Sequence, residues 1–365
     1  MYLGNNSFIT SMNAYSQKRG ALLQRRSFLK IASGSAVTLA CSPRLNGSTD
    51  RTVMTVRGPI SSSQMGITLS HEHLLANFQP LADRQKQPWT YDLDEVVKVT
   101  LPYLQQIEKL GCRTFVDCTA VALGRDPRLL KRLSQESGLN ILTVTGNYAA
   151  IDAKFLPPYV FTDSVDALAQ RWTTEAKSGI EGTGIRPGLI KLGFNGGPLT
   201  DAEQKLIRAA AITHRKTGLT IGAHTGPAVS AFEQLSELKK AGIHPSAWIW
   251  IHAQNEPDHS QHIKAARTGA WISFDGISPD SLTKHVDLVK RMKDEGLLHR
   301  VLVSQDAGWY HVGEAHGGTF RTFSTVFSEF IPALHAAKFT QAEIHTLFNE
   351  NPANAFSIST RTTHT

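Results

Sequence analysis

Eight short apolar runs, separated by stretches of helical periodicity, constrain the fold of this chain more than any other feature. Each run is rich in β-branched residues, as strands are, whereas the stretches between the runs place apolar residues three and four positions apart. Two such stretches, at 92–111 and 201–218, end in glycine, a common helix terminator. The runs are GITLSHEH (66–73), RTFVDCT (113–119), NILTVTGN (140–147), PGLIKLGF (187–194), LTIGAHTG (219–226), AWIWIHA (247–253), AWISFDG (270–276) and RVLVSQDAG (300–308).

Eight strand–helix units within roughly 300 residues predict an α/β fold of the (β/α)8 TIM-barrel type. The main alternative, a doubly wound parallel sheet, usually has a glycine-rich turn after its first strand, where this chain has HEHLLANF (71–78). The segment TVMTVRGPISSSQMG (52–66) predicts a short β-hairpin ahead of the barrel. We therefore expect one domain over residues 52–358, followed by a C-terminal tail at 359–365.

The basic charge of the chain is concentrated near its N-terminus. The formal net charge is +7, but residues 1–41 contain five basic residues and no acidic residue, which leaves 33 basic and 31 acidic residues elsewhere. A nearly neutral body gives no electrostatic basis for binding a polyanion, so we expect no nucleic-acid partner.

The N-terminal segment itself indicates export. QRRSFLK (24–30) precedes a weakly apolar run, and paired arginines in this setting are typical of a twin-arginine signal peptide. This interpretation gives a signal peptide at 1–41, a linker at 42–51, the twin-arginine export machinery as a partner, and a periplasmic or secreted protein. An amphipathic N-terminal helix is the alternative. Cys41 leaves two processing routes open, a lipid anchor at its thiol or simple cleavage close by.

The two remaining cysteines, Cys112 and Cys118, fall on one predicted strand. Six residues of extended chain separate them by roughly 20 Å, which is far beyond the reach of a disulfide. We expect both to be small buried apolar residues.

Polar residues stand at the ends of several predicted strands. In a (β/α)8 barrel the carboxyl ends of the strands carry the chemistry, so these positions are candidates for a site. A lone histidine after an apolar run is more often a hydrogen-bonded core residue, but several imidazoles and a carboxylate at one level are costly to bury without a shared ion. The candidate metal ligands are His71, His73, Lys191, His224, His252 and Asp306.

Lys191 is unusual because it lies within the apolar stretch LIKLG, where an unpaired ammonium group is costly. One interpretation is an ion pair with Asp306 inside the barrel. The other is a lysine that has reacted with CO2 to form a carbamate, whose two oxygens can bridge two cations. Glu72 projects to the opposite face of its strand from the neighbouring histidines, so we interpret it as structural.

Taken together, these motifs resemble the phosphotriesterase branch of the amidohydrolase superfamily. The HxH pair, the lysine of the fourth strand, the two later histidines and the final aspartate match the family pattern, and the resemblance extends from about Thr52 to Phe356. The matching segments are GITLSHEHLL (66–75), GRDPRLL (124–130), GIEGTGIRPGLIKLG (179–193), AHTG (223–226) and NPANAF (351–356).

The resemblance implies a role for each candidate ligand. The first histidine pair and Asp306 would hold the more buried of two divalent cations, and His224 and His252 would hold the more exposed one. Carboxylated Lys191 and a hydroxide would bridge them. The cations would be zinc, or manganese, cobalt or iron. The hydroxide would attack an ester-type substrate while Asp306 accepts its proton.

Departures from the family pattern bear on the substrate. Relatives that hydrolyse phosphotriesters well often carry acidic residues after strand six and a histidine after strand seven as a proton relay. This chain has Asn255 at the first position and Gly276, after Asp275, at the second. Lactonase relatives often carry a tyrosine after strand three, which Tyr148 matches in part, although a packing role for Tyr148 is equally open.

The long segment AGWYHVGEAHGGTFRTF (307–323) follows strand eight, and we expect it to form a wall or lid of the site. Trp309 and Tyr310 would contact an apolar part of the substrate, while His311 and His316 are interpreted as surface residues.

The residues and the resemblance together predict a binuclear metal-dependent hydrolase of lactones or carboxylic esters, with secondary phosphotriesterase activity. The alternatives are a true organophosphate triester hydrolase, an amidohydrolase acting on an amide, and a non-catalytic binding protein. The resemblance also suggests a homodimer, because relatives are often dimers.

Overall fold

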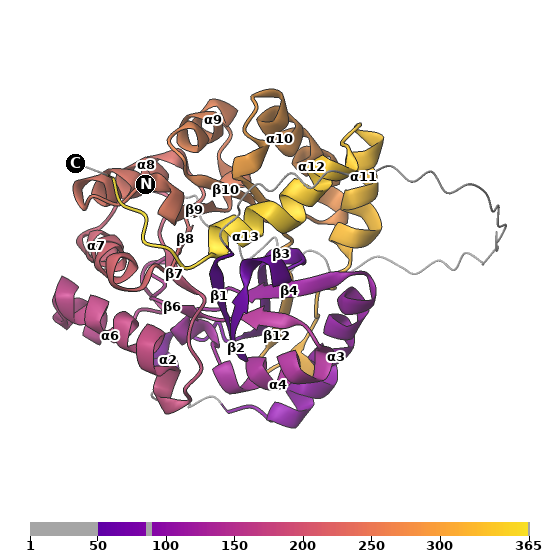
Figure 1. The fold of residues 1–365 in the computed structure, drawn as a ribbon. Helices are drawn as coiled ribbons and strands as arrows, with labels where there is room; N and C mark the ends of the chain where they lie inside the picture. The colour runs from indigo at the N-terminus through magenta and orange to yellow at the C-terminus, as the bar shows by residue number, and fades with distance from the viewer. Residues whose placement is uncertain (1–49, 85–89, 364–365) are drawn as a thin grey trace, which may run out of the picture. The chain divides into compact units, whose positions relative to one another are not determined.

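A computed structural model describes residues 50–84 and 90–363, in which strands alternate with helices (Figure 1). The described residues form one compact unit. The predicted signal peptide, most of the predicted linker and Cys41 lie outside the described residues. Among the residues described, no helix combines the length and the apolar character that crossing a membrane requires.

The strands fall on the apolar runs of the sequence, and the predicted third strand divides at Thr143 into two short strands. A further strand, β12, lies in the segment that the sequence suggested was only a loop. The strands are β1 (Thr52–Thr55), β2 (Gly58–Ser61), β3 (Ile67–Ala76), β4 (Cys112–Asp117), β5 (Asn140–Leu142), β6 (Val144–Thr145), β7 (Leu189–Gly193), β8 (Ile221–His224), β9 (Trp248–Ile251), β10 (Trp271–Phe274), β11 (Val301–Val303) and β12 (Gly308–His311).

The predicted hairpin is present, because β1 and β2 pair antiparallel from Thr52 opposite Ser61 to Thr55 opposite Gly58. It is shorter than the predicted span of 52–66. Ser61 ends it by capping a single 3-10 turn, η1 (Ser62–Gln64), and its backbone N–H donates to the Gln64 side chain at 2.9 Å. This reciprocal capping redirects the chain toward β3.

The remaining strands are parallel and follow one another in chain order. One sheet has the order β12-β3-β4-β5 and the other β11-β10-β9-β8-β7-β6. The two sheets are joined along the chain where the third run divides into β5 and β6. β3 also contacts β11, since the Ser70 hydroxyl donates to Val303 O at 3.1 Å. Just after β11, Asp306 N donates to His71 O at 3.1 Å. The architecture is therefore α/β, with the strand order that a (β/α)8 barrel predicts.

Several of the helices begin at a residue whose side chain caps them. Asp92 accepts from two N–H groups at the start of α3, and Thr200 and Glu203 form a capping box at the start of α7. The helices are α2 (Leu81–Arg84), α3 (Leu93–Lys109), α4 (Pro127–Ser137), α5 (Tyr159–Thr162), α6 (Val165–Ser178), α7 (Asp201–Thr217), α8 (Ala228–Lys240), α9 (His259–Arg267), α10 (Leu282–Asp294), α11 (Ile331–Ala336), α12 (Gln341–His345) and α13 (Asn351–Phe356).

Two layers of core follow from the alternation of side chains along the strands. One large cluster contains residues of both strands and helices, and a smaller one gathers residues from successive strands, including Val116, Leu142, Leu189 and Ile249. Cys112 belongs to the large cluster and Cys118 to the smaller one. Both are buried and neither forms a disulfide, as predicted.

The two ends of the parallel strands differ. At the amino ends, the C-terminal segment is hydrogen-bonded across several elements: Ile358 N donates to Thr52 O, Ser359 N to Gly218 O and Thr363 N to Gly242 O. The carboxyl ends instead carry the buried polar side chains that form the candidate site.

Candidate metal centre

His71 and His73 lie inside β3, not at its end as expected, because β12 pairs with its last residues and extends it to Ala76. Both imidazoles are buried, and their Nε2 atoms lie 3.1 Å apart. Their Nδ1 atoms have other partners: Asp275 Oδ2 lies 3.0 Å from that of His71, and Thr119 Oγ1 lies 2.8 Å from that of His73. The two Nε2 atoms are therefore left to face a common point.

Asp306, after β11, brings a carboxylate to these nitrogens. Its Oδ1 lies 3.1 Å from His73 Nε2 and 3.7 Å from His71 Nε2. This oxygen is buried, and none of the described residues gives it a hydrogen bond of good geometry. Two imidazole nitrogens and a carboxylate oxygen thus converge on one point, and the carboxylate oxygen has no hydrogen-bond donor. Such a set of atoms suits a divalent cation.

Glu72 supports the backbone that carries Asp306. Its two carboxylate oxygens accept hydrogen bonds from the Ser304 hydroxyl at 2.7 Å, from Gln305 N at 2.9 Å and from Ala307 N at 2.7 Å. These contacts agree with the structural role expected for Glu72, since they tie β3 to the turn after β11.

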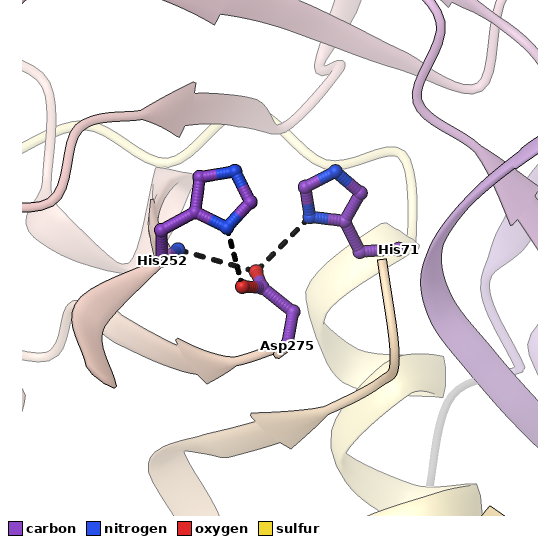
Figure 2. A group of neighbouring side chains, drawn as sticks. All are labelled: His71, His252 and Asp275. Carbon is purple, nitrogen blue, oxygen red and sulfur yellow. Dashed lines mark hydrogen bonds and ion pairs between the residues drawn. The ribbon is translucent and has the colours of Figure 1, made fainter. Parts of the chain in front are cut away.

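Asp275, directly after β10, lies between two imidazoles that come from different strands (Figure 2). Its Oδ2 is 3.0 Å from His71 Nδ1, and its Oδ1 is 2.6 Å from His252 Nδ1. The Ser273 hydroxyl and the Gln254 amide donate to the same carboxylate at 2.8 and 3.0 Å. Asp275 thus orients both rings, the usual role of a carboxylate behind metal-binding histidines.

His224 and His252 complete the cluster of imidazoles. Their ring centroids lie 4.4 Å apart, and those of His71 and His252 lie 5.0 Å apart. The closest sets of ligand atoms are His71 with His73 and Asp306, and His71 with His252 and Asp275. His224 belongs to neither set, although its ring packs edge-on against His252.

Lys191 is buried in the middle of β7, at 2% exposure. Its Nζ lies 5.9 Å from the centroid of the Tyr148 ring. Within residues 50–84 and 90–363 it forms no ion pair, so the pairing with Asp306 that the sequence left open is not formed. An ammonium group here has no counter-charge in contact, which is an unfavourable state for a buried cation.

The charge states of His71, His73, His224 and Asp306 suit metal binding. The pKa of His252 is instead raised above 6.5, because burial, which lowers it, is outweighed by the Asp275 carboxylate. Burial lowers the pKa of His71 and of His73 to about 4, and it lowers the pKa of His224 well below 6.5. Burial alone would raise the pKa of Asp306, but the close approach of His73 and the other neighbouring imidazoles lowers it below its ordinary value of 3.8. Neutral imidazoles and an ionised carboxylate are the forms that ligate a cation.

Two of the three residues predicted to contact substrate lie at the cluster. The Tyr148 hydroxyl is 3.2 Å from His224 Nε2, and burial raises the pKa of Tyr148, so the hydroxyl keeps its proton. Trp309 stacks on His73 with centroids 3.7 Å apart, and its indole N–H donates to Asp306 O at 2.9 Å. Phe78, which the sequence did not single out, has its ring centroid 5.4 Å from that of Trp309, so the two aromatic side chains form a wall beside His73.

Tyr310 does not join Trp309 beside the imidazoles, and its predicted contact with substrate stays a prediction. Successive residues of a strand point to opposite sides, so Tyr310 of β12 is directed away from Trp309. It is buried in the large core cluster beside Glu95 of α3, whose nearby charge and hydrogen bond, together with burial, raise the pKa of Tyr310. His316 is exposed as expected and lies 3.3 Å from Glu95, whereas His311 packs 5.6 Å from Phe78.

Asp275 and Thr119 are the site residues that the sequence did not identify. Asp275 directly follows the seventh strand, so inspection of strand ends for carboxylates as well as histidines would have found it. Thr119 follows the second strand, and an uncharged threonine at that position gives no hint of a role. Only the fold places its hydroxyl behind His73.

Comparison with known proteins agrees with this geometry. The sequence profile described as "Phosphotriesterase family" matches residues 51–356. The chain is 30% identical over 304 residues to a phosphotriesterase homology protein of Escherichia coli (strain K12), covering 81% of this chain and 100% of that protein.

Two further relatives have names that specify different reactions. An aryldialkylphosphatase of Saccharolobus solfataricus is 29% identical over 310 residues, covering 82% of this chain and 97% of the relative. An N-acetyltaurine hydrolase of Rattus norvegicus is 27% identical over 341 residues, covering 82% of this chain and 96% of the relative.

Proposed function

The chain belongs to the phosphotriesterase family, and on this premise we propose that it is a binuclear metal-dependent hydrolase with its site at the carboxyl end of a closed (β/α)8 barrel. The observation that carries the proposal is the convergence of two neutral imidazoles and one unsatisfied carboxylate oxygen at 3.1–3.7 Å. His71, His73 and Asp306 would hold one cation, and His224 and His252 would hold the other.

We propose that Lys191 carries a CO2-derived carbamate. A carbamate would replace a buried, unpaired ammonium group with an anion whose two oxygens can serve one cation each. When bound, the two cations, for which we propose zinc, would lower the pKa of a water molecule and polarise the substrate oxygen.

The chain's own side chains would supply the rest of the chemistry. Asp306 is ionised at neutral pH, so it is the group that would accept the proton released as water adds to the substrate. Asp275 would hold His71 and His252 in place during the reaction. Tyr148 keeps its proton and would donate a hydrogen bond to a polar group of the substrate.

The substrate class that we favour is an uncharged lactone or carboxylic ester. Trp309 and Phe78 supply an apolar wall beside the imidazoles. The position of the family's relay histidine is Gly276, and Asp275 is committed to two rings, so phosphotriester hydrolysis would be secondary. An amide substrate is the second candidate, because one relative is named as an N-acetyltaurine hydrolase.

We also retain export by the twin-arginine route and a homodimer as proposals. The QRRSFLK segment supports the first, and cell fractionation with Arg25 and Arg26 both replaced by lysine would test it. Size-exclusion chromatography with light scattering would test the second.

The decisive experiment compares substrates on the metal-loaded protein. A γ-lactone, an aryl ester, paraoxon and N-acetyltaurine are assayed side by side, and metal is measured by elemental analysis. We expect about two cations per chain and the highest kcat/KM for the lactone or the aryl ester. A dominant rate with paraoxon or with N-acetyltaurine would replace the favoured substrate, and no bound metal would overturn the proposal.

Lys191→Ala tests the binuclear site directly. We expect kcat/KM to fall by about a hundredfold or more and the metal content to fall below two cations. Lys216→Ala, at an exposed lysine of α7, is the matched control and should match the wild type. Wild-type rates in Lys191→Ala would contradict a role for this residue.

A further inference from the structure

A cavity of about 430 Å³ opens at the amino ends of the strands, away from the imidazole cluster. It is lined by residues that directly precede strands, among them Arg51 before β1 and Arg300 before β11, and by Trp271, the first residue of β10. Arg361 of the C-terminal segment lines it as well. None of these residues takes part in the proposed hydrolysis.

The cavity carries an excess of positive charge. Three of its lining residues are arginines, and its carboxylate-bearing lining residue is Glu350, whose Oε2 already accepts from the Thr346 hydroxyl at 2.9 Å. Across the described ranges, no carboxylate forms an ion pair with Arg51, Arg300 or Arg361. Clustered guanidinium groups without counter-charges repel one another, and a bound anion would relieve that repulsion.

The three arginines are not equivalent. Arg361 is tied into the protein, since its guanidinium group donates to Thr220 Oγ1 at 2.8 Å and to the carbonyls of Asn354 and Ser357 at 2.9 Å each. Burial lowers the pKa of Arg361 to about 10, and the positive charges of Arg51 and Arg300 act in the same direction.

Arg51 and Arg300 differ from Arg361 because their guanidinium groups have no hydrogen-bond acceptor in the part of the chain that the structure describes. Arg300 instead lies over the Trp271 ring, 5.2 Å from its centroid, which fixes its position without using its N–H groups. Arg51 is exposed and Arg300 partly exposed, so their guanidinium N–H groups are open to a ligand that enters the cavity.

We propose that this cavity is a second binding site, which takes a small multivalent oxyanion through Arg51 and Arg300. Guanidinium groups bind carboxylate and phosphate oxygens through paired N–H donors, and the volume suits a compact metabolite-sized anion. The alternative is that the arginines only help to hold the C-terminal segment in place, because residues at the amino end of such a barrel usually contribute to stability. Arg361 fits that alternative, whereas the guanidinium groups of Arg51 and Arg300 form no hydrogen bond to the C-terminal segment among the described residues.

Calorimetric titration of the metal-loaded, full-length protein tests the proposal. The probes are glycerol 3-phosphate and tricarballylate, at constant ionic strength, so that the two arms separate phosphate from carboxylate recognition. We expect at least one probe to bind one site per chain with a Kd of about 1 mM or below. Arg51→Gln and Arg300→Gln should each weaken that binding about tenfold, because each removes a charge-assisted contact.

Arg215→Gln, at an exposed arginine of α7, is the matched control and should bind like the wild type. The hydrolytic kcat/KM should be unchanged in all three variants, which separates this site from the metal centre. Absence of binding by both probes would overturn the proposal. Equal binding by the wild type and Arg300→Gln would do so too, since the anion would then occupy another place, such as the metal centre.

Discussion

Asp275 shows how much one side chain contributes to the candidate site. It has no exposed surface, and its carboxylate accepts from two imidazoles, a hydroxyl, an amide and the backbone N–H of His252. The electrostatic interactions and hydrogen bonds with His252 and His71 hold the pKa of this carboxyl well below 3.8 in spite of its burial. The sequence shows a carboxylate at the end of a strand but not what it holds, because its partners lie on or directly after three strands, β3, β9 and β10.

We predict that Asp275→Asn weakens metal binding by about 10- to 100-fold, since an amide cannot accept from both rings with two anionic oxygens. Competition with a chromogenic chelator measures the affinity, and far-UV circular dichroism checks the fold. Asp280→Asn, at an exposed acid five residues on, should leave the affinity unchanged. Wild-type affinity in Asp275→Asn would show that the two rings hold their positions without it.

A buried histidine outside the site provides a pH prediction. Burial lowers the pKa of His262 to about 4, and its Nε2 donates to Ala253 O at 2.7 Å. The unfolded chain, with an ordinary histidine pKa of about 6.5, therefore binds the proton first as the pH falls, and stability is lost between pH 6.5 and pH 4.

His262→Phe should remove this contribution. Between pH 7 and pH 5 the free energy of unfolding of the wild type should fall by about 2 kcal/mol more than that of the variant, as measured by urea denaturation. At pH 7 the variant should itself be less stable by about 1–3 kcal/mol, because Ala253 O loses its donor. Parallel pH profiles for the two proteins would contradict the assignment.

At the scale of elements, β12 is the feature that local sequence patterns could not predict. Residues 308–311 are expected as loop because glycines surround them, yet they pair with β3, more than 230 residues earlier in the chain. The pairing needs Gly308, whose backbone approaches β3 so closely that a Cβ would lie 1.9 Å from His73 O. Similarly, the division of the third run at Thr143 depends on which neighbouring strand each half joins.

Gly308→Ala and Gly313→Ala form a matched pair. Their φ angles are 96° and 95°, but a Cβ at Gly313 meets no atom within 4 Å. We expect Gly313→Ala to cost about 1 kcal/mol of stability through backbone strain alone. Gly308→Ala should cost several kcal/mol and also weaken metal binding, because it displaces the strand that adjoins His73. Equal thermal stabilities would show that β12 tolerates the displacement.

At the scale of the whole molecule, the order of the strands and the set of polar residues at their ends followed from periodicity and from the family resemblance. His71, His73 and Asp306 are brought together because strands in parallel array present their carboxyl ends on one side. The direction of Tyr310 could not be predicted in the same way. It depends on whether residues 308–311 form a strand, which is decided by contacts far away in the sequence.

Residues 358–365 offer a test of how the strand starts are secured. We predict that their removal lowers Tm by about 5–10 °C, because the Arg361 side chain and several backbone hydrogen bonds across the amino ends are lost. Differential scanning fluorimetry measures the change. Arg361→Gln should give a smaller decrease, and kcat/KM at 25 °C should persist in both. A Tm unchanged by the deletion would contradict this role.

The fastening of the C-terminal segment across the amino ends bears on how such a protein can evolve. The C-terminal segment is fastened at the end opposite the imidazoles, so changes in the loops beside the imidazoles leave these hydrogen bonds intact. Lineages that share this scaffold are then free to diverge in what they hydrolyse while keeping the ligands themselves. Relatives named for a phosphate ester and for an acylated amine are what such a history would leave behind.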